Sequence, residues 1–241
     1  MCVSTLSFAG DVAKLTHIGG SADGKSYAYM ESGIGDGLGN AYATVRIIDT
    51  ASNSFVGPAF ERIQTEEEME NPAIDLSTVE AEALEKAKET FKKLEIFPSQ
   101  KGSVVASRKM TDLEARKLKD VSFSAYPYEA ADSYKLILTE SPAEPKDKNS
   151  CMYVGAGKSR KLKLELFNNQ TKKTSVLQAD SGIPASRGCP HKYEIEDVVL
   201  LQPNQMSEYA SKVIVFIRTF SYGFEGDDVR FIAVSGSLNK L

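Results

Sequence analysis

Hydrophobic and polar residues alternate with a period of two through most of the chain, and this period predicts β-strands with one buried face. Asp-Gly and other glycine-rich turns separate neighbouring runs, as antiparallel hairpins require. Strands are predicted at 13–19, 26–32, 41–49 and 54–60, then at 120–128, 133–141, 161–169, 173–180, 193–201, 212–220 and 228–236. The short turns between successive runs predict antiparallel meanders.

One of these runs is apolar on both faces. Residues 213–217 read Val-Ile-Val-Phe-Ile, and the first polar side chain after them is Arg218. A strand exposed to solvent on one face would carry polar residues at every second position. We therefore expect this strand to lie in the centre of the molecule.

Residues 76–96 change to the period of an α-helix. Their apolar positions form one stripe, made of Val79, Ala83, Leu84, Ala87, Phe91 and Leu94. Ser77 and Glu80 have the spacing of a capping box, and Pro98 marks the end of the helix. We expect one long helix that packs on a sheet through this stripe.

Two shorter segments flank this helix. The acidic segment 65–75 contains Pro72 and is predicted to be a connector. Residues 111–120 predict a second helix, with Thr111 and Glu114 as a capping box.

Length and charge restrict the domain organisation and the partners. The chain has 241 residues and a formal net charge of −4, and it contains no long apolar or basic run. These features predict no transmembrane segment and no nucleic-acid partner. We expect a single β-rich domain over 10–241 with a helical insertion at about 66–120, present as a monomer or weak dimer.

The first nine residues have the character of a processed segment. They are small and apolar, and Ser7 and Ala9 occupy the −3 and −1 positions of a cleavage site before Gly10. Residues 1–9 are therefore predicted to be the remnant of a secretion signal. The alternative is a short N-terminal strand of a cytosolic protein.

The expected state of the cysteines depends on whether residues 1–9 are the remnant of a secretion signal. Removal of Cys2 with the signal would leave Cys151 and Cys189, an even number in polar, turn-rich surroundings. An even number favours a disulfide in an oxidising compartment. Two free thiols, or metal ligands that include His191, are the alternatives.

The two ends of the chain share a sequence pattern. Asp11-Val12 and Leu15 align with Asp197-Val198 and Leu201, and Val45-Arg46 and Ile48 align with Val229-Arg230 and Ile232. Three correspondences in the same order indicate a duplicated antiparallel unit, and similar units tend to pack side by side. We expect the N- and C-terminal units to lie next to each other.

The hairpin "SADGKSYAYMES" resembles the repeat of periplasmic propeller proteins, but only one good copy is present. The predicted fold is therefore mainly β with one long helix, an α+β chain. Its antiparallel meanders are expected in a sandwich or partial-propeller-like arrangement, with similar N- and C-terminal units.

A resemblance covers nearly the whole chain. The strings "AGDVAKL", "SADGKSYAYMESGIGDGLGNAYATVRIIDTASNSFVGP", "SRGCP" and "FSYGFEGDDVRFIAVSGSL" are together similar to an uncharacterised bacterial family of predicted secreted proteins. The resemblance implies a periplasmic or secreted protein and, with Cys189 in "SRGCP", a disulfide. It implies no activity and no catalytic residues.

Candidate chemistry lies in the loops. Asp36 and Asn40 stand in a glycine-rich loop and could form a calcium-like site with Glu225, Asp227 and Asp228 of the matching loop. A flexible strand connection and a phosphate cradle are the alternatives for the loop of Asp36. No other cofactor is expected.

A second candidate site lies around Cys189 and His191, which could serve a hydrolase. In contrast, Glu194 and Glu196 alternate on one strand and are interpreted as ordinary solvent-facing carboxylates.

Three hypotheses for function follow. The first is an exported, non-catalytic protein that binds an unknown envelope protein or a small ligand. The second is an envelope hydrolase with a site near Cys189 and His191, and the third is a structural accessory protein.

Overall fold

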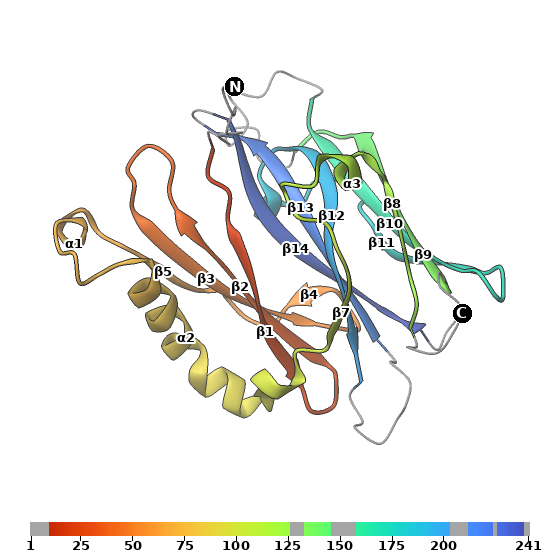
Figure 1. Cartoon of the computed structure of the whole chain (residues 1–241), viewed down its shortest axis with the longest axis horizontal. Helices are drawn as coiled ribbons and strands as arrows, with labels where there is room; N and C mark the ends of the chain where they lie inside the picture. The colour runs from red at the N-terminus through yellow and green to blue at the C-terminus, as the bar shows by residue number, and fades with distance from the viewer. Residues whose placement is uncertain (1–9, 126–132, 146–157, 203–211, 224–225, 239–241) are drawn as a thin grey trace, which may run out of the picture.

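Three antiparallel β-sheets and one long helix form four successive layers in the computed structural model, which describes residues 10–125, 133–145, 158–202, 212–223 and 226–238 (Figure 1). The long helix covers one face of an N-terminal sheet. The other face of that sheet packs on a central sheet, and an outer sheet covers the far side of the central one. The prediction of a mainly β fold built from antiparallel meanders is confirmed.

The N-terminal sheet has the strand order β4-β3-β2-β1-β6, and β5 also pairs with β3. Its strands are β1 (Lys14–Ser21), β2 (Ser26–Ile34), β3 (Ala41–Asp49), β4 (Ser54–Phe55), β5 (Phe60–Ile63) and β6 (Ile96–Phe97). Side chains alternate across β2 and β3. Tyr27 and Tyr29 therefore face the central sheet, and Ala28 and Met30 face the helix.

The long helix α2 (Leu76–Lys93) packs on the N-terminal sheet. Val79, Ala83 and Ala87 of the predicted stripe are fully buried against it. The other residues of the stripe, Leu84, Phe91 and Leu94, are partly buried against the same cluster. Small side chains at the centre of the contact let the helix approach the sheet closely.

The helix caps differ from the prediction. Asp75 rather than Ser77 is the N-cap of α2 and accepts a bond of 2.9 Å from Thr78 N. Glu80 instead accepts a bond of 2.6 Å from Ser32 Oγ on the sheet, and Ser77 Oγ donates a bond of 2.7 Å to Asp75 Oδ1. Asp75 lies earlier in the chain and caps as well as serine does, which allows Leu76 to join the helix.

Residues 66–120 are not purely helical. They contain α1 (Glu66–Met69), α2, η1 (Pro98–Gln100) and α3 (Leu113–Lys117), but also β6 and β7 (Ser103–Ser107). Thr65 and Glu68 form a capping box that starts α1 inside the predicted connector, and Asp112 rather than Thr111 caps α3. Because β6 pairs with β1 and β7 pairs with β12, this segment links the N-terminal and central sheets.

The central and outer sheets are built from the remaining strands. The central sheet has the order β14-β13-β12-β7, with β12 (Pro190–Leu201), β13 (Lys212–Tyr222) and β14 (Asp227–Ser237). The outer sheet has the order β11-β10-β9-β8, with β8 (Asp120–Phe123), β9 (Tyr134–Pro142), β10 (Arg160–Asn168) and β11 (Thr174–Ala179). The short helix η3 (Ala185–Arg187) connects the two sheets.

The central sheet is apolar on both faces, as its sequence predicts. Val213, Val215 and Ile217 pack against the outer sheet, and Ile214 and Phe216 pack against the N-terminal sheet. All five side chains have no exposed surface. The expectation that this strand lies in the centre of the molecule is therefore confirmed.

The two ends of the chain meet at the edge strand β14. Val12 forms a parallel bridge with Val229, and Val229 N donates a bond of 2.8 Å to Asp11 O. The N- and C-terminal units are both three-stranded meanders and lie side by side. Their duplication stays a prediction, since Asp11 precedes β1 whereas the aligned Asp197 lies within β12.

Asn53 joins all three sheets. It stands in the turn between β3 and β4 with a φ of 56°. Its Oδ1 accepts bonds from Ser235 N at 2.7 Å and Ser235 Oγ at 2.8 Å on β14. Its Nδ2 donates a bond of 3.0 Å to Leu177 O on β11. Asparagine suits this position because it tolerates positive φ and offers both a donor and an acceptor.

We expect Asn53→Ala to lower the free energy of unfolding by about 2–4 kcal/mol, because it removes three hydrogen bonds and strains a left-handed backbone. Asn53→Gly should lose less, since glycine removes the bonds but adopts the same φ without strain. Urea denaturation of both variants measures the difference. Ser52→Ala in the same turn is the control, and a loss below about 0.5 kcal/mol for Asn53→Ala would contradict the linking role.

Candidate functional site

Two of the residues predicted to bind calcium, Asp227 and Asp228, contact separate partners. Asp227 Oδ1 lies 2.8 Å from His191 Nε2, and Asp228 Oδ1 accepts a bond of 3.1 Å from Asp11 N. Gly35 N bonds to Asn40 O in the turn that also contains Asp36. Glu225 lies outside the described residues. Among the described residues, no three His, Cys, Asp or Glu side chains are grouped to hold a metal.

The candidate hydrolase residues are not arranged as an exposed nucleophile and base. Cys189 is buried, with 4% of its surface exposed. His191 stacks on Tyr222, with ring centroids 4.3 Å apart, and its Nε2 contacts Asp227. Cys151 lies outside the described residues, so its pairing with Cys189 stays a prediction. The other histidine, His17, lies in the interior, where its Nε2 is 2.8 Å from Asp197 Oδ2.

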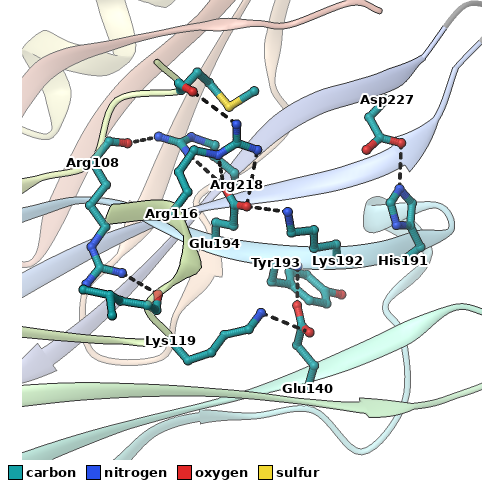
Figure 2. Close-up of polar contacts among 12 residues, drawn as sticks. Arg108, Arg116, Lys119, Glu140, His191, Lys192, Tyr193, Glu194, Arg218 and Asp227 are labelled. Atoms are coloured by element: carbon teal, nitrogen blue, oxygen red, sulfur yellow. Dashed lines mark hydrogen bonds and ion pairs between the residues drawn. The ribbon is translucent and has the colours of Figure 1, made fainter. Parts of the chain in front are cut away.

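A cluster of buried charges surrounds the first half of β12, and Figure 2 shows Arg108, Arg116, Lys192, Glu194 and Arg218 of this cluster. Arg218, with no exposed surface, donates a bond of 2.9 Å to Glu194 Oε2 and also contacts Glu196 Oε2. Arg116 Nε donates a second bond of 2.9 Å to Glu194 Oε2, and Lys192 Nζ lies 2.5 Å from Oε1. The interpretation of Glu194 and Glu196 as solvent-facing carboxylates is therefore wrong.

The interpretation failed because the alternation of side chains along a strand places Glu194 and Glu196 on one face of β12 but does not show what covers that face. The segment between β7 and β8, which contains Arg108 and Arg116, lies over it. The main chain of this segment is also bound, since Arg108 N donates to Glu196 O at 2.8 Å and Arg108 O accepts from Arg218 Nη2.

The two carboxylates respond differently to this environment. Burial acts to raise the pKa of Glu194, but the bonds from Arg116 and Lys192 outweigh it and hold that pKa below its usual value. Burial raises the pKa of Glu196 to about 7, against the attraction of Arg218 and with added repulsion from Asp197. Most donors of the cluster are satisfied within the protein, which indicates that it holds the segment in place.

A different arrangement is found at the corner between the N-terminal and central sheets. Here a cleft of about 430 Å³ is lined by residues of β3 and of the edge strand β14. We call it the corner cleft and define it by Tyr42, Thr44 and Arg46 on β3, Arg230 and Phe231 on β14, and Arg187 of η3. The first three point to the same side because residues on a strand alternate.

Two buried carboxylates hold the polar side chains of the corner cleft. Asp11 accepts a bond of 2.7 Å from Tyr42 Oη and one of 2.5 Å from Arg230 Nη2. Glu31 accepts a bond of 3.1 Å from Arg46 Nε, and its other oxygen accepts from Phe231 N across the sheet boundary. Burial and the bond to Asp11 raise the pKa of Tyr42 well above its usual value, so its hydroxyl stays protonated.

Sequence reasoning did not identify this cleft, although one signal pointed to it. The internal similarity aligns Val45-Arg46 with Val229-Arg230, and both arginines line the corner cleft. Their meeting could not be read from the pattern, because it depends on how the two sheets are stacked. Of the predicted metal ligands that the structure describes, only Asn40 also lines the cleft.

The raised pKa of Glu196 predicts a pH-dependent stability. Between the ordinary glutamate pKa of 4.5 and about 7, the folded protein keeps a proton that the unfolded chain releases. The contribution of this residue to stability is therefore greatest at low pH and falls as the pH rises through this window. Glu196→Gln cannot lose the proton, so its stability relative to the wild type should increase by up to about 3 kcal/mol between pH 4.5 and 8.

Urea denaturation at several pH values measures this difference, with Glu165→Gln on the outer sheet as the control. A difference between Glu196→Gln and the wild type that is constant with pH would contradict the assignment.

No helix in the described part is both long and apolar enough to span a membrane.

Comparison with known proteins gives one result for the chain. No curated protein matches the chain. The family model described as "Predicted secreted protein (DUF2259)" matches residues 28–237, which include β3, the corner cleft arginines and all of β14. The chain belongs to this family of predicted secreted proteins, and the protein is therefore assigned to the secreted or periplasmic compartment.

Proposed function

We propose that this exported protein binds a small polar ligand in the corner cleft without catalysing its conversion. The observation that carries the proposal is the cleft itself, since its volume of about 430 Å³ lies in the range of small-molecule sites. Its polar side chains come from two sheets and are oriented by buried partners. Groups fixed in this way lose little conformational entropy when a ligand binds.

The chemistry of the lining favours binding over hydrolysis. No histidine or cysteine is among the described residues that line the corner cleft. Of its three carboxylates, Asp11 and Glu31 are already bonded to arginines, and the third, Glu61, is exposed to solvent on β5, so none of them is held as a buried general base. The alternative hydrolase near Cys189 and His191 has weaker support because Cys189 is buried.

A structural accessory role has less support at this edge of the molecule. A strand edge that joins another chain must offer free backbone groups. On β14, Val229 N is bonded to Asp11 O, and Phe231 N and Ser235 N are bonded to Glu31 and Asn53. These bonds cap the edge and leave the cleft beside it as the accessible feature.

Blocking the cleft tests the proposal. Thr44 lies in the middle of the β3 wall, so Thr44→Trp should fill the space and weaken ligand binding at least about 10-fold. Organic acids, amino acids, sugars and sugar phosphates would be screened by thermal shift, and hits measured by calorimetry. Thr139→Trp is the matched control, because Thr139 is an exposed strand residue of the outer sheet. Hits that bind Thr44→Trp as well as the wild type would contradict the proposal.

We further propose that Cys151 and Cys189 form a disulfide in the exported protein. The support is the assignment to a family of predicted secreted proteins, because disulfides form and persist in oxidising compartments. Replacing both cysteines with serine should lower stability by at most about 4 kcal/mol, the loop-closure value for a loop of this size.

Peptide mapping without reductant should find the two cysteines in one linked fragment of protein isolated from an oxidising compartment. Alkylation of both thiols in that untreated protein would contradict the pairing.

A further inference from the structure

Two of the three arginines of the corner cleft, Arg46 and Arg230, present its charge, because the third, Arg187, is paired with the buried carboxylate of Asp180. Arg46 lies over the ring of Phe55, with its Cζ 5.2 Å from the ring centroid, and Arg230 lies over Tyr42 at 4.8 Å. Each guanidinium is thus held by an aromatic ring and by a carboxylate. Such contacts fix the plane of a guanidinium and the directions of its N–H groups.

The arginines are accessible and their carboxylate partners are not. The side chains of Arg46 and Arg230 are 27% and 39% exposed, against 3% for Glu31 and 7% for Asp11. Each carboxylate also has a second donor, Phe231 N for Glu31 and Tyr42 Oη for Asp11. A molecule that enters the cleft therefore meets guanidinium groups, with the compensating negative charge behind them.

Arg46 has N–H groups that form no hydrogen bond to another described residue. Only its Nε bonds to another described residue, which leaves the N–H groups of Nη1 and Nη2 exposed to the cleft. Arg230 uses Nη1 for Asp11 O and Val229 O, and Nη2 for Asp11 Oδ2. This differs from the buried cluster on β12, where both terminal nitrogens of Arg218 are bonded.

We propose that the corner cleft recognises its ligand through a carboxylate or phosphate group, which Arg46 binds with its terminal nitrogens beside the positive charge of Arg230. This inference rests on the proposed ligand-binding function and specifies the ligand class. A planar guanidinium with two parallel N–H groups matches the oxygens of both anions, and the bonds are charge-assisted.

The other lining residues of the corner cleft restrict the part of the ligand that lies away from its anionic group. Thr44, Thr219 and Ser221 supply hydroxyl groups to the lining. Glu61, paired with Thr44 in register on β5, is an exposed carboxylate on the same wall. Because Glu61 repels an anion, the ligand is a small molecule with one anionic group and hydroxyl or ammonium donors at its other end.

Calorimetry with defined probes tests the assignment. The oxyanion probes are glycerol 3-phosphate, with glycerol as its neutral counterpart, and inorganic phosphate and serine. At least one oxyanion probe should bind the wild type, and glycerol should not. Arg46→Gln should weaken that binding about 10- to 100-fold, as expected for lost charge-assisted bonds. Arg46→Lys should retain part of it.

A matched control lies on the opposite face of the same sheet. Arg62 is paired with Glu68 and Glu82 near α2, away from the cleft, so Arg62→Gln should change affinity less than about 2-fold. Circular dichroism checks that each variant is folded. The ¹⁵Nε–Hε resonance of Arg46, assigned by its absence in Arg46→Gln, should shift when the probe is added to wild-type protein. This measurement holds even if Arg46→Gln is unstable, because Arg46→Lys can then assign the resonance.

The outcomes separate this inference from the proposed function. A ligand whose binding is lost in Thr44→Trp but unchanged in Arg46→Gln would overturn the oxyanion assignment and leave the cleft as a binding site. Failure of every oxyanion probe to bind the wild type would also overturn the assignment. If none of the screened molecules binds in a way that Thr44→Trp affects, both proposals fall.

Discussion

The burial of both faces of the central sheet is the constraint on which the rest of the structure depends. Strands β12 to β14 carry apolar side chains toward both neighbours, and burial of apolar surface contributes about 25 cal/mol per Å². One covering layer would leave half of that surface in water. The N-terminal sheet and the outer sheet therefore both have to pack on it. The N-terminal sheet is apolar on its own second face, which α2 then covers.

At the edge of a buried sheet, backbone N–H groups have no partner in the sheet. Side chains from the neighbouring layer accept hydrogen bonds from them. A buried backbone N–H without a partner costs about as much as a lost hydrogen bond. On β14 the outward-facing amides of Phe231 and Ser235 find Glu31 and Asn53 of the N-terminal sheet. The same contacts set the position of one sheet on the other. Glu31 therefore has two roles, because it caps the strand edge and orients Arg46 in the corner cleft.

The two arginine clusters show how similar groups take different roles. Around Glu194 and Glu196, Arg218 is fully buried and Arg116 nearly so, and the carboxylates and backbone carbonyls of the protein use their donors. This cluster fastens the segment between β7 and β8 to the central sheet (Figure 2). At the corner cleft, the carboxylates are buried and the guanidinium groups are partly exposed. Both clusters contain arginines. Exposure of the arginine N–H groups distinguishes a surface that can bind a ligand from a buried ion-pair cluster that stabilises the fold.

Apart from β6, β7 and the break between β4 and β5, the sequence by itself determined the strands, the long helix and the central position of β13. These follow from local periodicity, because the spacing of apolar residues within one element is set by the geometry of that element. The pattern of residues 41–49 matches β3 at both ends, and the apolar stripe of 76–96 is the buried side of α2. Family membership and export were likewise accessible, since they rest on strings of residues.

Only the tertiary structure decided which polar residues are paired inside the protein and which remain available. Glu194 and Glu196 have the spacing of solvent-facing residues, but a segment about 80 residues earlier in the chain covers them. Arg46 and Arg230 are far apart in the sequence and line the same cleft because two sheets are stacked with β14 at the edge. Contacts of this kind depend on the relative placement of whole elements. A periodic pattern fixes which face of a strand is polar, but it carries no information about what lies opposite that face.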